Sequence, residues 1–295
     1  MKLLIVGKNG QLAQELVKRK PEGIELIALG RKEMDITDAS TTMEVVGQYS
    51  PDLVINAAAY TAVDRAEEER ALAFDVNARG AEQLAWACRE FRARLIHVST
   101  DFVFDGRQSR PYGEEDGVRP LNVYGLSKAA GEAVVRSILP EAIIIRTAWV
   151  YSAHGSNFLN TMLRLMNERD QLGVVSDQVG TPTSTRTLAD TIYHLAGQPN
   201  CQGIYHCTDE GVASWYDFAV AILEEGRSAG LLPQERAVAI KPISTAEYPT
   251  PAKRPAYSVL DKRRLTEELG VELAHWRQAL REVLQEKVSG ENASQ

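Results

Sequence analysis

Residues 3–13 read Leu3-Leu-Ile-Val-Gly7-Lys-Asn-Gly10-Gln-Leu-Ala13, an apolar strand that runs through two glycines into a helical pattern. Gly7 would permit a tight turn, and Gly10 would let the backbone approach a pyrophosphate at the N-terminus of the helix. The spacing Gly-x-x-Gly-x-x-Ala differs from the usual Gly-x-Gly-x-x-Gly dinucleotide pattern. The segment therefore predicts a nucleotide-binding turn, and a plain strand-to-helix turn is the alternative.

The first half of the chain alternates apolar runs with helical patterns, which is typical of βαβ units around a parallel sheet. Runs such as Ala142-Ile-Ile-Ile145 fit strands that are buried on both faces. The expected fold class is α/β, a doubly wound parallel-sheet Rossmann-type domain with a smaller, partly interleaved substrate-binding region. The expected strands are Leu3–Val6, Glu25–Leu29, Leu53–Ala57, Arg94–Ser99 and Ala142–Arg146, and the expected helices between them are Gln11–Lys20, Ser40–Tyr49, Ala71–Phe91 and Val123–Ile138.

After Trp149 the alternation breaks down into turn-rich segments and more widely spaced helical patterns. We predict an NAD(P)-binding Rossmann-type domain over residues 1–149, to which later segments return, a mainly substrate-binding region over 150–288, and a loose tail over 289–295. The later region should lie over the carboxyl edge of the sheet, where open α/β sheets bind ligands. Its expected helices are Phe158–Glu168, Thr187–Ala196, Trp215–Glu225 and Trp276–Lys287.

Composition limits the partners of the chain. Its 295 residues are 44% hydrophobic and 25% charged, as in an ordinary globular protein. A net charge of −7 without a basic cluster argues against nucleic acid and against an anionic membrane, so a small molecule is the expected partner. No signal-peptide core and no apolar run of membrane-spanning length is present in the sequence, and we expect a cytoplasmic protein.

The end of the second expected strand bears on the choice of cofactor. Gly30-Arg31-Lys32 stands where an NAD-selective enzyme usually places an acid for the ribose 2′-hydroxyl. The guanidinium of Arg31 suits a 2′-phosphate instead, so NADPH is favoured and NADH stays possible. The alternative is a solvated surface arginine. Asp35-Ile36 should lie near the adenine, and Asn56-Ala-Ala-Ala-Tyr-Thr61 leaves the third strand with small residues that allow a ligand to approach closely.

Tyr124 and Lys128 lie four residues apart in Asn122-Val-Tyr-Gly-Leu-Ser-Lys128, a spacing that places both side chains on one face of a helix. The ammonium is then expected to lower the pKa of the phenol, which could exchange a proton near neutral pH. Thr100, in Val98-Ser-Thr-Asp101 at the end of the fourth expected strand, should reach the same sheet edge. The alternative is a partly buried aromatic side chain beside a lysine on a solvated helix face.

These three groups suit the movement of a hydride to or from a carbonyl carbon while a proton moves on the oxygen. We expect Tyr124 to act as the general acid in reduction and Thr100 to hydrogen-bond the substrate oxygen. Lys128 would bind the nicotinamide ribose hydroxyls. Val98 at the strand end and Gly7 in the turn are further cofactor-binding candidates.

The motifs above resemble those of the extended short-chain dehydrogenase/reductase superfamily and, more narrowly, those of the dTDP-4-dehydrorhamnose reductases. The Tyr-Lys pair is typical of the whole superfamily, whereas later segments narrow the resemblance and extend it over nearly the whole chain. These segments are Arg146-Thr-x-Trp149-Val-Tyr151, Asn157-Phe158, Asp177-Gln-x-Gly180-x-Pro182-Thr183 and Arg254-Pro255.

The resemblance implies that NADPH or NADH reduces the C4 ketone of dTDP-4-dehydro-β-L-rhamnose to give dTDP-β-L-rhamnose. It also implies roles for the residues that match the family motifs. Carried over by position, Gly10, Gln11 and Leu12 hold the pyrophosphate, Asp35 and Ile36 lie by the adenine, Ala59, Tyr60 and Thr61 line the cofactor, Thr100 and Asp101 contact the sugar, and Trp149 packs against the substrate.

The chain departs from the family pattern at a few positions. Some relatives carry an aspartate where Gly30 stands, which puts strict use of NADH in doubt. Some relatives use Mg²⁺ at a subunit contact, and Glu15 matches one position of that site. We expect a free surface glutamate there rather than a metal ligand, and the resemblance allows a homodimer. Phe102 stands where relatives can have tyrosine, which removes a hydroxyl from the pocket.

Two other classes of function stay open. A nucleotide-sugar 4,6-dehydratase or 4-epimerase would share the fold, the cofactor and the Tyr-Lys pair. Dehydration needs an acid-base pair after the threonine, and Thr100-Asp101 is followed by Phe102 instead of glutamate, which disfavours that reaction. A non-catalytic subunit, like the regulatory subunit of methionine adenosyltransferase, could retain the same residues after losing the chemistry.

Overall fold

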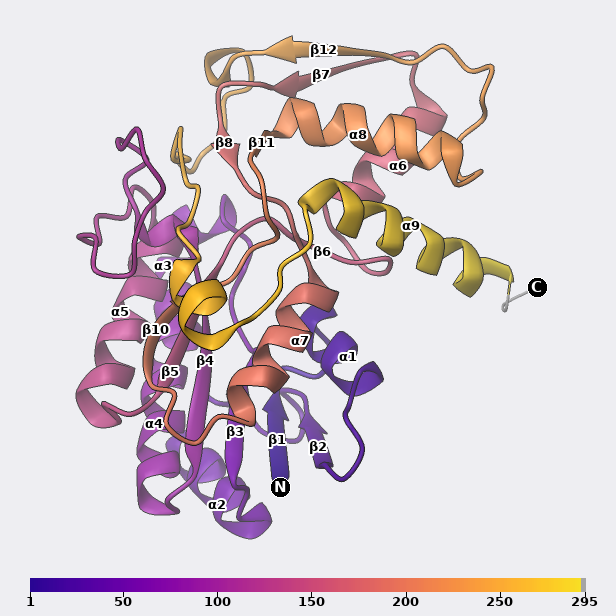
Figure 1. Ribbon diagram of the computed structural model, residues 1–295. Coiled ribbons are helices and arrows are strands. Elements are labelled where there is room, and N and C mark those ends of the chain that lie inside the picture. Colours follow the sequence, from indigo (N-terminus) through magenta and orange to yellow (C-terminus); the bar gives the residue numbers. More distant parts are fainter. Residues whose placement is uncertain (293–295) are drawn as a thin grey trace.

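The computed structural model describes residues 1–292 and is built around one six-stranded parallel sheet (Figure 1). The strand order is β10-β5-β4-β3-β1-β2, so β1 pairs with β2 on one side and with β3 on the other. The order therefore reverses beside β1, which is where doubly wound sheets open a crevice for ligands. The strands are β1 (Lys2–Val6), β2 (Glu25–Leu29), β3 (Leu53–Asn56), β4 (Arg94–Thr100), β5 (Ile143–Thr147) and β10 (Gly203–His206).

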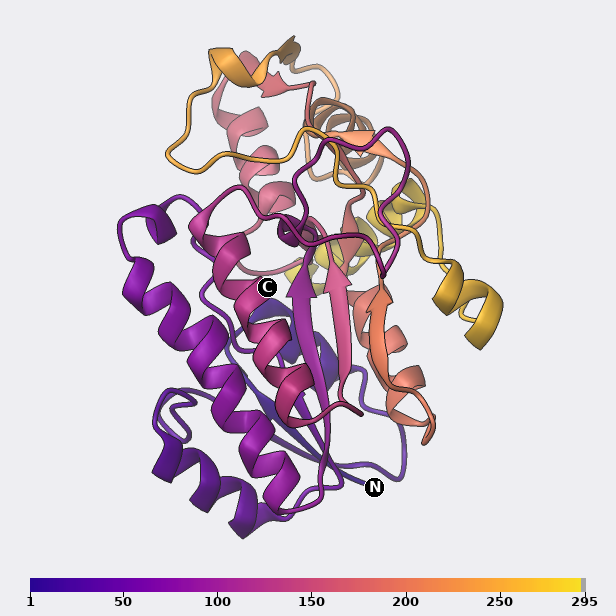
Figure 2. The same cartoon turned by 90° about the vertical axis from the view of Figure 1, so that its left-hand side faces the viewer.

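Helices cover both faces of this sheet (Figures 1 and 2). Because side chains alternate along a strand, Leu3 and Ile5 pack on the side of α1 and α7, whereas Leu4 and Val6 pack on the side of α2, α4 and α5. The prediction of a doubly wound sheet with strands buried on both faces is confirmed. The helices are α1 (Gln11–Lys18), α2 (Ala39–Tyr49), α4 (Gly80–Glu90), α5 (Val123–Ile138) and α7 (Thr185–Ala196).

The helix expected over residues 71–91 is interrupted by a π-helical turn. It consists of α3 (Arg70–Phe74), the π turn η2 (Asp75–Arg79) and then α4. The wider turn places the buried amide of Asn77 between the loop after β3 and helix α5. Its Oδ1 accepts from Tyr60 N at 2.8 Å, and its Nδ2 donates to Ser127 Oγ at 2.9 Å. The π turn thus joins the loop after β3 to the first turns of α5.

A second region, formed by most of residues 150–184 and 207–292, lies over the carboxyl edge of the sheet (Figure 1). Its own apolar core includes Leu159, Phe218, Ile222 and Leu280. Its strands form three two-stranded sheets, β6 with β9, β7 with β12, and β8 with β11. The strands are β6 (Val150–Tyr151), β7 (Gln171–Val175), β8 (Val179–Gly180), β9 (Thr183–Ser184), β11 (Ala213–Ser214) and β12 (Ala239–Ile243), and the helices are α6 (Phe158–Glu168), α8 (Trp215–Ser228) and α9 (Trp276–Asn292).

Short helical turns complete the connections between these elements. The 3₁₀ and π turns outside η2 are η1 (Arg65–Glu67), η3 (Asp101–Val103), η4 (Thr245–Glu247) and η5 (Arg264–Glu268). Within residues 1–292, none of the helices combines the length and apolarity that a bilayer crossing requires.

Three segments after Trp149 return to the main sheet, and one of them is η5, whose Leu265 lies in the same apolar core as Leu3 and Ile5. Helix α7 packs beside α1, and β10 pairs in parallel with β5, with Gly203 opposite Ile143. The sequence did not predict β10. At the other end of the chain, α9 continues through Ser289 to Asn292, where a loose tail was expected, and residues 293–295 lie outside the described part.

A buried ion pair lies behind the strand ends and joins α5 to β5. Arg146 Nε donates to Glu132 Oε1 at 2.9 Å and Arg146 Nη2 donates to Glu132 Oε2 at 2.7 Å, with side chains only 2% and 5% exposed. Ser99 Oγ donates to the same carboxylate at 2.5 Å. Because Ser99 belongs to β4, this cluster holds β4, β5 and α5 in register directly beneath the sheet edge.

Candidate functional site

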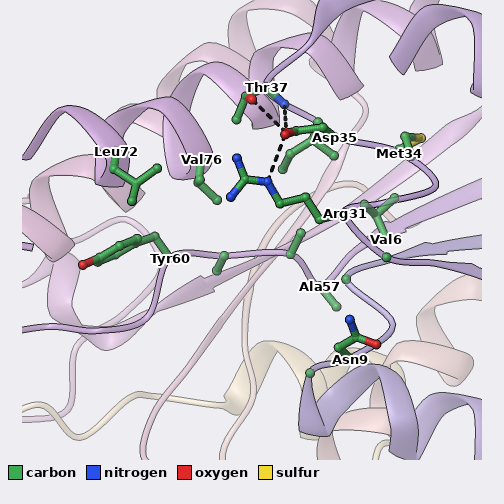
Figure 3. A pocket seen from close by; sticks show the side chains of 16 residues that line it. Val6, Asn9, Arg31, Met34, Asp35, Thr37, Ala57, Tyr60, Leu72 and Val76 are labelled. Carbon is green, nitrogen blue, oxygen red and sulfur yellow. Dashed lines mark hydrogen bonds and ion pairs between the residues drawn. The ribbon is translucent and has the colours of Figure 1, made fainter. Parts of the chain in front are cut away.

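Two cavities meet at the carboxyl edge of the sheet. The β2-side cavity, of about 330 Å³, lies beside the ends of β1 and β2 (Figure 3). The central cavity, of about 680 Å³, lies between the sheet and the second region. Both cavities are lined by Asn9, Gly10 and Ala57–Ala59, so they form one continuous path across the point where the strand order reverses.

The turn after β1 has the shape that an anion requires. Gly7 adopts a φ of +93°, and a Cβ there would lie 2.7 Å from Ala58 N, so only glycine fits. Gly10 is the N-cap of α1 and has no side chain to offer to the N–H groups of the first turn. These N–H groups, together with the cradle at Gly7, fit the pyrophosphate of a dinucleotide.

Arg31 points into the β2-side cavity toward Val76 (Figure 3). Its Nε donates to Asp35 Oδ2 at 2.9 Å. The other oxygen, Asp35 Oδ1, accepts from Thr37 N at 3.0 Å and from Thr37 Oγ1 at 2.7 Å. The guanidinium is therefore held at the cavity by a fixed carboxylate, and its remaining N–H groups are available to a ligand.

The first turn of α5 positions Tyr124 over the end of β4. Asn122 Oδ1 accepts from Gly125 N at 2.7 Å and caps the helix. A Cβ on Gly125 would collide with Phe102 O, so glycine lets the helix approach η3 closely. The rings of Phe102 and Tyr124 then meet edge to face, with centroids 5.6 Å apart. The phenol consequently lies in the central cavity with Thr100.

The pKa values of the Tyr124–Lys128 pair are governed by burial. Burial raises the pKa of Tyr124 to about 12, against a lowering contribution from a hydrogen bond with Thr100. Burial lowers the pKa of Lys128 to about 8, against the charge of Glu132. Lys128 Nζ donates to Val98 O at 2.6 Å. The expectation that Lys128 lowers the phenol pKa is wrong, because burial, with the charge of Asp101 adding to it, raises that pKa. Tyr124 is protonated at neutral pH, as an acid must be.

We expect kcat/KM for ketone reduction to fall as the pH rises above about 8, approaching a tenfold loss per pH unit. Lys128 is expected to bind the nicotinamide ribose hydroxyls in its charged form. That form is present below the pKa of Lys128 and is lost above it. Steady-state kinetics over about pH 6 to 10 would measure the profile, because kcat/KM reports the groups of the free enzyme. A profile that stays flat across this range would contradict a role for the Lys128 charge.

Asp101 supports Thr100 from within the protein. Asp101 is 1% exposed, and its Oδ1 accepts from Thr100 Oγ1 at 3.0 Å. Burial raises the pKa of Asp101 to about 6, against hydrogen bonds from Ser258 and Thr100. Because Ser258 comes from the C-terminal part of the chain, the second region contributes to the environment of this carboxyl.

Two tryptophans form one wall of the central cavity. Trp149 and Trp215 stack with ring centroids 3.6 Å apart and an interplanar angle of 7°. Trp149 adopts a φ of +48°, in the left-handed region that a bulky residue rarely occupies. Strained backbone of this kind tends to persist where function requires it. The wall offers a flat aromatic surface to a ligand.

Arg254 adds a positive charge to the same cavity. Its two terminal nitrogens donate to Asp64 Oδ1 at 3.1 Å and Asp64 Oδ2 at 2.8 Å. Asp64 follows β3, whereas Arg254 lies in the second region, so the pair links the two parts of the chain beside the cavity. The sequence reasoning missed both Arg254 and Trp215 as site residues; only the family motif Arg254-Pro255 gave a signal for the arginine.

Gln11 connects the phosphate turn to the second region. Its Nε2 donates to Val150 O at 3.2 Å, and its Oε1 accepts from Asn157 Nδ2 at 3.3 Å and lies 3.0 Å from Ser152 Oγ. The side chain is therefore occupied by the protein, and the backbone N–H is what Gln11 can offer to a pyrophosphate. The resemblance did not indicate this second contact.

The structure brings every predicted site residue except Glu15 to one of the two cavities. Gly7, Gly10, Arg31, Asp35, Ile36, Ala59 and Tyr60 line the β2-side cavity. Gly10, Gln11, Leu12, Ala59, Thr61, Val98, Thr100, Asp101, Tyr124, Lys128 and Trp149 line the central cavity.

Glu15 is buried at 6% exposure, and the expectation of a free surface glutamate is wrong. Burial raises the pKa of its carboxyl, with Glu286 adding to the shift and Lys18, Arg19 and Arg186 opposing it. No group of three or more His, Cys, Asp or Glu side chains within residues 1–292 could hold a metal ion.

Comparisons with known proteins cover almost the whole chain. Residues 1–289 match the family model described as RmlD substrate binding domain. The chain is 44% identical to the spore coat polysaccharide biosynthesis protein SpsK of Bacillus subtilis, covering 98% of each chain. It is 43% identical to dTDP-4-dehydrorhamnose reductase of Aggregatibacter actinomycetemcomitans, covering 96% of this chain and 98% of that one.

A solved structure shows the same arrangement. The dTDP-4-dehydrorhamnose reductase of Bacillus anthracis, in complex with NADP, is 36% identical with a TM-score of 0.91, covering 97% of this chain and 99% of that one. The sequence similarity and the structural similarity both extend over nearly the full length of the chain. The chain therefore belongs to the RmlD substrate binding domain family, the family of the dTDP-4-dehydrorhamnose reductases.

Proposed function

We propose that this protein reduces the C4 ketone of dTDP-4-dehydro-β-L-rhamnose to give dTDP-β-L-rhamnose. NADPH is the proposed reductant, and NADH is a second substrate of the same site. The observation that carries the proposal is that Thr100, Tyr124 and Lys128 line one cavity that continues into the phosphate turn at Gly10. The relatives named as reductases, and the NADP complex of one of them, support it.

The chain supplies the proton and the orientation. When bound, the reduced nicotinamide supplies a hydride to the carbonyl carbon. Thr100 hydrogen-bonds the ketone oxygen by turning its hydroxyl proton from Asp101 Oδ1 to the substrate. Tyr124, whose pKa of about 12 keeps the phenol protonated, donates its proton as negative charge develops on that oxygen. Lys128, fixed by its bond to Val98 O, binds the ribose hydroxyls with its remaining N–H groups.

The rest of the central cavity suits a nucleotide sugar. The guanidinium of Arg254 provides positive charge for a diphosphate. The stacked rings of Trp149 and Trp215 provide an apolar surface for the ligand, with Trp149 packing against the substrate. Asp101 lines the same cavity and is the residue proposed to contact the sugar together with Thr100.

The two parts of the chain have different proposed tasks. Residues 1–149, with α7 and β10, bind the cofactor, and residues 150–288 mainly bind the substrate. Arg254 and Trp215, which come from the second region, support this division. We also propose that the protein acts in the cytoplasm, where biosynthetic reductases find their nucleotide cofactors.

Purified protein, NADPH and dTDP-4-dehydro-β-L-rhamnose together provide the test. We expect one NADPH to be consumed for each dTDP-β-L-rhamnose formed, followed by absorbance and by NMR of the product. An epimerase or dehydratase would change the sugar without net loss of NADPH, and a non-catalytic subunit would change neither. Either result would contradict the proposal.

Arg31→Ala should weaken NADPH binding far more than NADH binding. The two nucleotides differ only in the 2′-phosphate, and Arg31 lines the cavity where the adenosine half is proposed to lie. Loss of a charge-assisted hydrogen bond makes a change of about tenfold or more reasonable for NADPH. Titration by nicotinamide fluorescence would measure both dissociation constants. Parallel losses would show that Arg31 does not contact a 2′-phosphate.

A further inference from the structure

We propose that Lys8 is a second cation for the 2′-phosphate of NADPH and acts with Arg31 beside Gly30. The proposal rests on the proposed cofactor site and names a further residue that determines nicotinamide specificity. Sequence reasoning placed only Arg31 there, because Lys8 lies in a different part of the chain, within the phosphate turn.

The backbone brings Lys8 against the end of β2. Gly7 N and Lys8 N both donate to Leu29 O, at 2.9 Å and 3.0 Å. A Cβ on Gly30 would lie 3.4 Å from Lys8 Cε. The alkyl chain of Lys8 therefore extends along Gly30, the position from which an aspartate would reach the ribose in an NAD-selective enzyme.

Both cations already have an acidic partner from the turn after β2. Lys8 Nζ forms an ion pair with Glu33 Oε1, while Glu33 Oε2 accepts from Gly30 N at 3.0 Å. Arg31 pairs with Asp35 in the same way. Two carboxylates thus stand where a bound phosphate would meet the cations, and all four side chains come from the two loops that frame Gly30.

These ion pairs are open to exchange. The side chains of Lys8 and Glu33 are 37% and 43% exposed, and that of Arg31 is 71% exposed. Exposed pairs of this kind contribute little to stability. A phosphomonoester carries about −1.5 to −2 charges near neutral pH, more than the single charge of a carboxylate. The 2′-phosphate of NADPH can therefore take over the cations, whereas the uncharged 2′-hydroxyl of NADH cannot.

The arrangement gives Lys8 and Glu33 opposite effects. Lys8 attracts the phosphate. Glu33 competes for Lys8 and repels the phosphate, and its carboxylate at Gly30 can accept a hydrogen bond from the 2′-hydroxyl of NADH. Removing the charge of Lys8 should therefore disfavour NADPH, and removing the charge of Glu33 should favour it.

The test is the binding of NADPH and NADH to Lys8→Met, with Lys32→Met as the matched control. Lys32 is an exposed lysine in the turn after β2, next to Arg31 in the chain. We expect Lys8→Met to weaken NADPH binding about tenfold and NADH binding less than about twofold. The effect on NADPH binding should shrink as the salt concentration is raised. Lys32→Met should leave both dissociation constants within about twofold.

Equal losses for the two nucleotides, or an equal NADPH loss in Lys32→Met, would overturn the proposal. Glu33→Gln should tighten NADPH and leave NADH unchanged or weaker, and weaker NADPH binding would also count against it. Binding is measured without the sugar. Selective loss of NADPH affinity in a protein that fails to reduce the ketone would therefore support Lys8 while refuting the proposed reaction.

Discussion

Tyr124→Phe is expected to lower kcat for ketone reduction by about 10²- to 10⁴-fold while leaving NADPH affinity nearly unchanged. The substitution keeps the ring, and with it the edge-to-face contact with Phe102 at 5.6 Å. It removes only the hydroxyl that is proposed to protonate the ketone oxygen. Thr100 would still hydrogen-bond that oxygen, so some turnover should remain.

Steady-state kinetics and NADPH fluorescence would separate the chemical step from binding. Tyr248→Phe is the matched control, because Tyr248 is 59% exposed and lines neither cavity. The Tyr248→Phe variant should have the same kcat as the unaltered protein. If Tyr124→Phe retained the kcat of this control, Tyr124 would not be the acid.

Glu132→Leu should destabilise the protein by about 3–5 kcal/mol, because it leaves the guanidinium of Arg146 buried without its partner. All three hydrogen bonds from Arg146 to that carboxylate would be lost, at 2.9 Å, 3.2 Å and 2.7 Å in the intact pair. Ser99 Oγ would lose its acceptor as well. The penalty comes from the unpaired charge more than from the lost attraction.

Urea unfolding of Glu132→Leu and Glu168→Leu would compare a buried with an exposed ion pair. Glu168 pairs with Arg164, and their side chains are 51% and 59% exposed, so its removal should cost under about 1 kcal/mol. Adding Arg146→Met to Glu132→Leu should recover most of the stability, because the guanidinium that had lost its partner is then removed as well. A Glu132→Leu loss as small as that of Glu168→Leu would contradict the account of this cluster.

The elements that the sequence predicted well depend on local patterns. The helices Val123–Ile138 and Phe158–Glu168 have the bounds that were expected, and each begins after an asparagine whose side chain caps it, Asn122 and Asn157. Strands such as β1 and β5 contain the continuous apolar runs Leu3–Val6 and Ile143–Ile145, which a local pattern identifies without reference to distant residues.

The missed elements depend on distant partners. Strand β10, Gly203–His206, is short and contains polar side chains, and it becomes a strand by pairing with β5. The two-residue strands of the second region, such as Val150–Tyr151 beside Thr183–Ser184, likewise exist only through pairing across the chain. Periodicity in a window of sequence cannot detect such contacts.

The same distinction applies to the site. Gly7, Thr100 and Tyr124 lie at the ends of strands or helices that local patterns locate. Their meeting at one edge of the sheet could therefore be predicted. Trp215 joins Trp149 only because the second region folds back over the sheet. The pKa of Tyr124 was expected to be lowered and is raised, because spacing along a helix shows which charges are near but not how deeply a phenol is buried.

The central claim is that reduced nicotinamide delivers a hydride to C4 of the sugar while Tyr124 protonates the oxygen. Its most direct test is a single turnover of dTDP-4-dehydro-β-L-rhamnose with NADPH deuterated at both C4 positions, followed by NMR and mass spectrometry of the product. The account predicts one deuterium, bound to C4 of dTDP-β-L-rhamnose. Product without deuterium at that carbon, or unchanged deuterated NADPH beside an altered sugar, would contradict it.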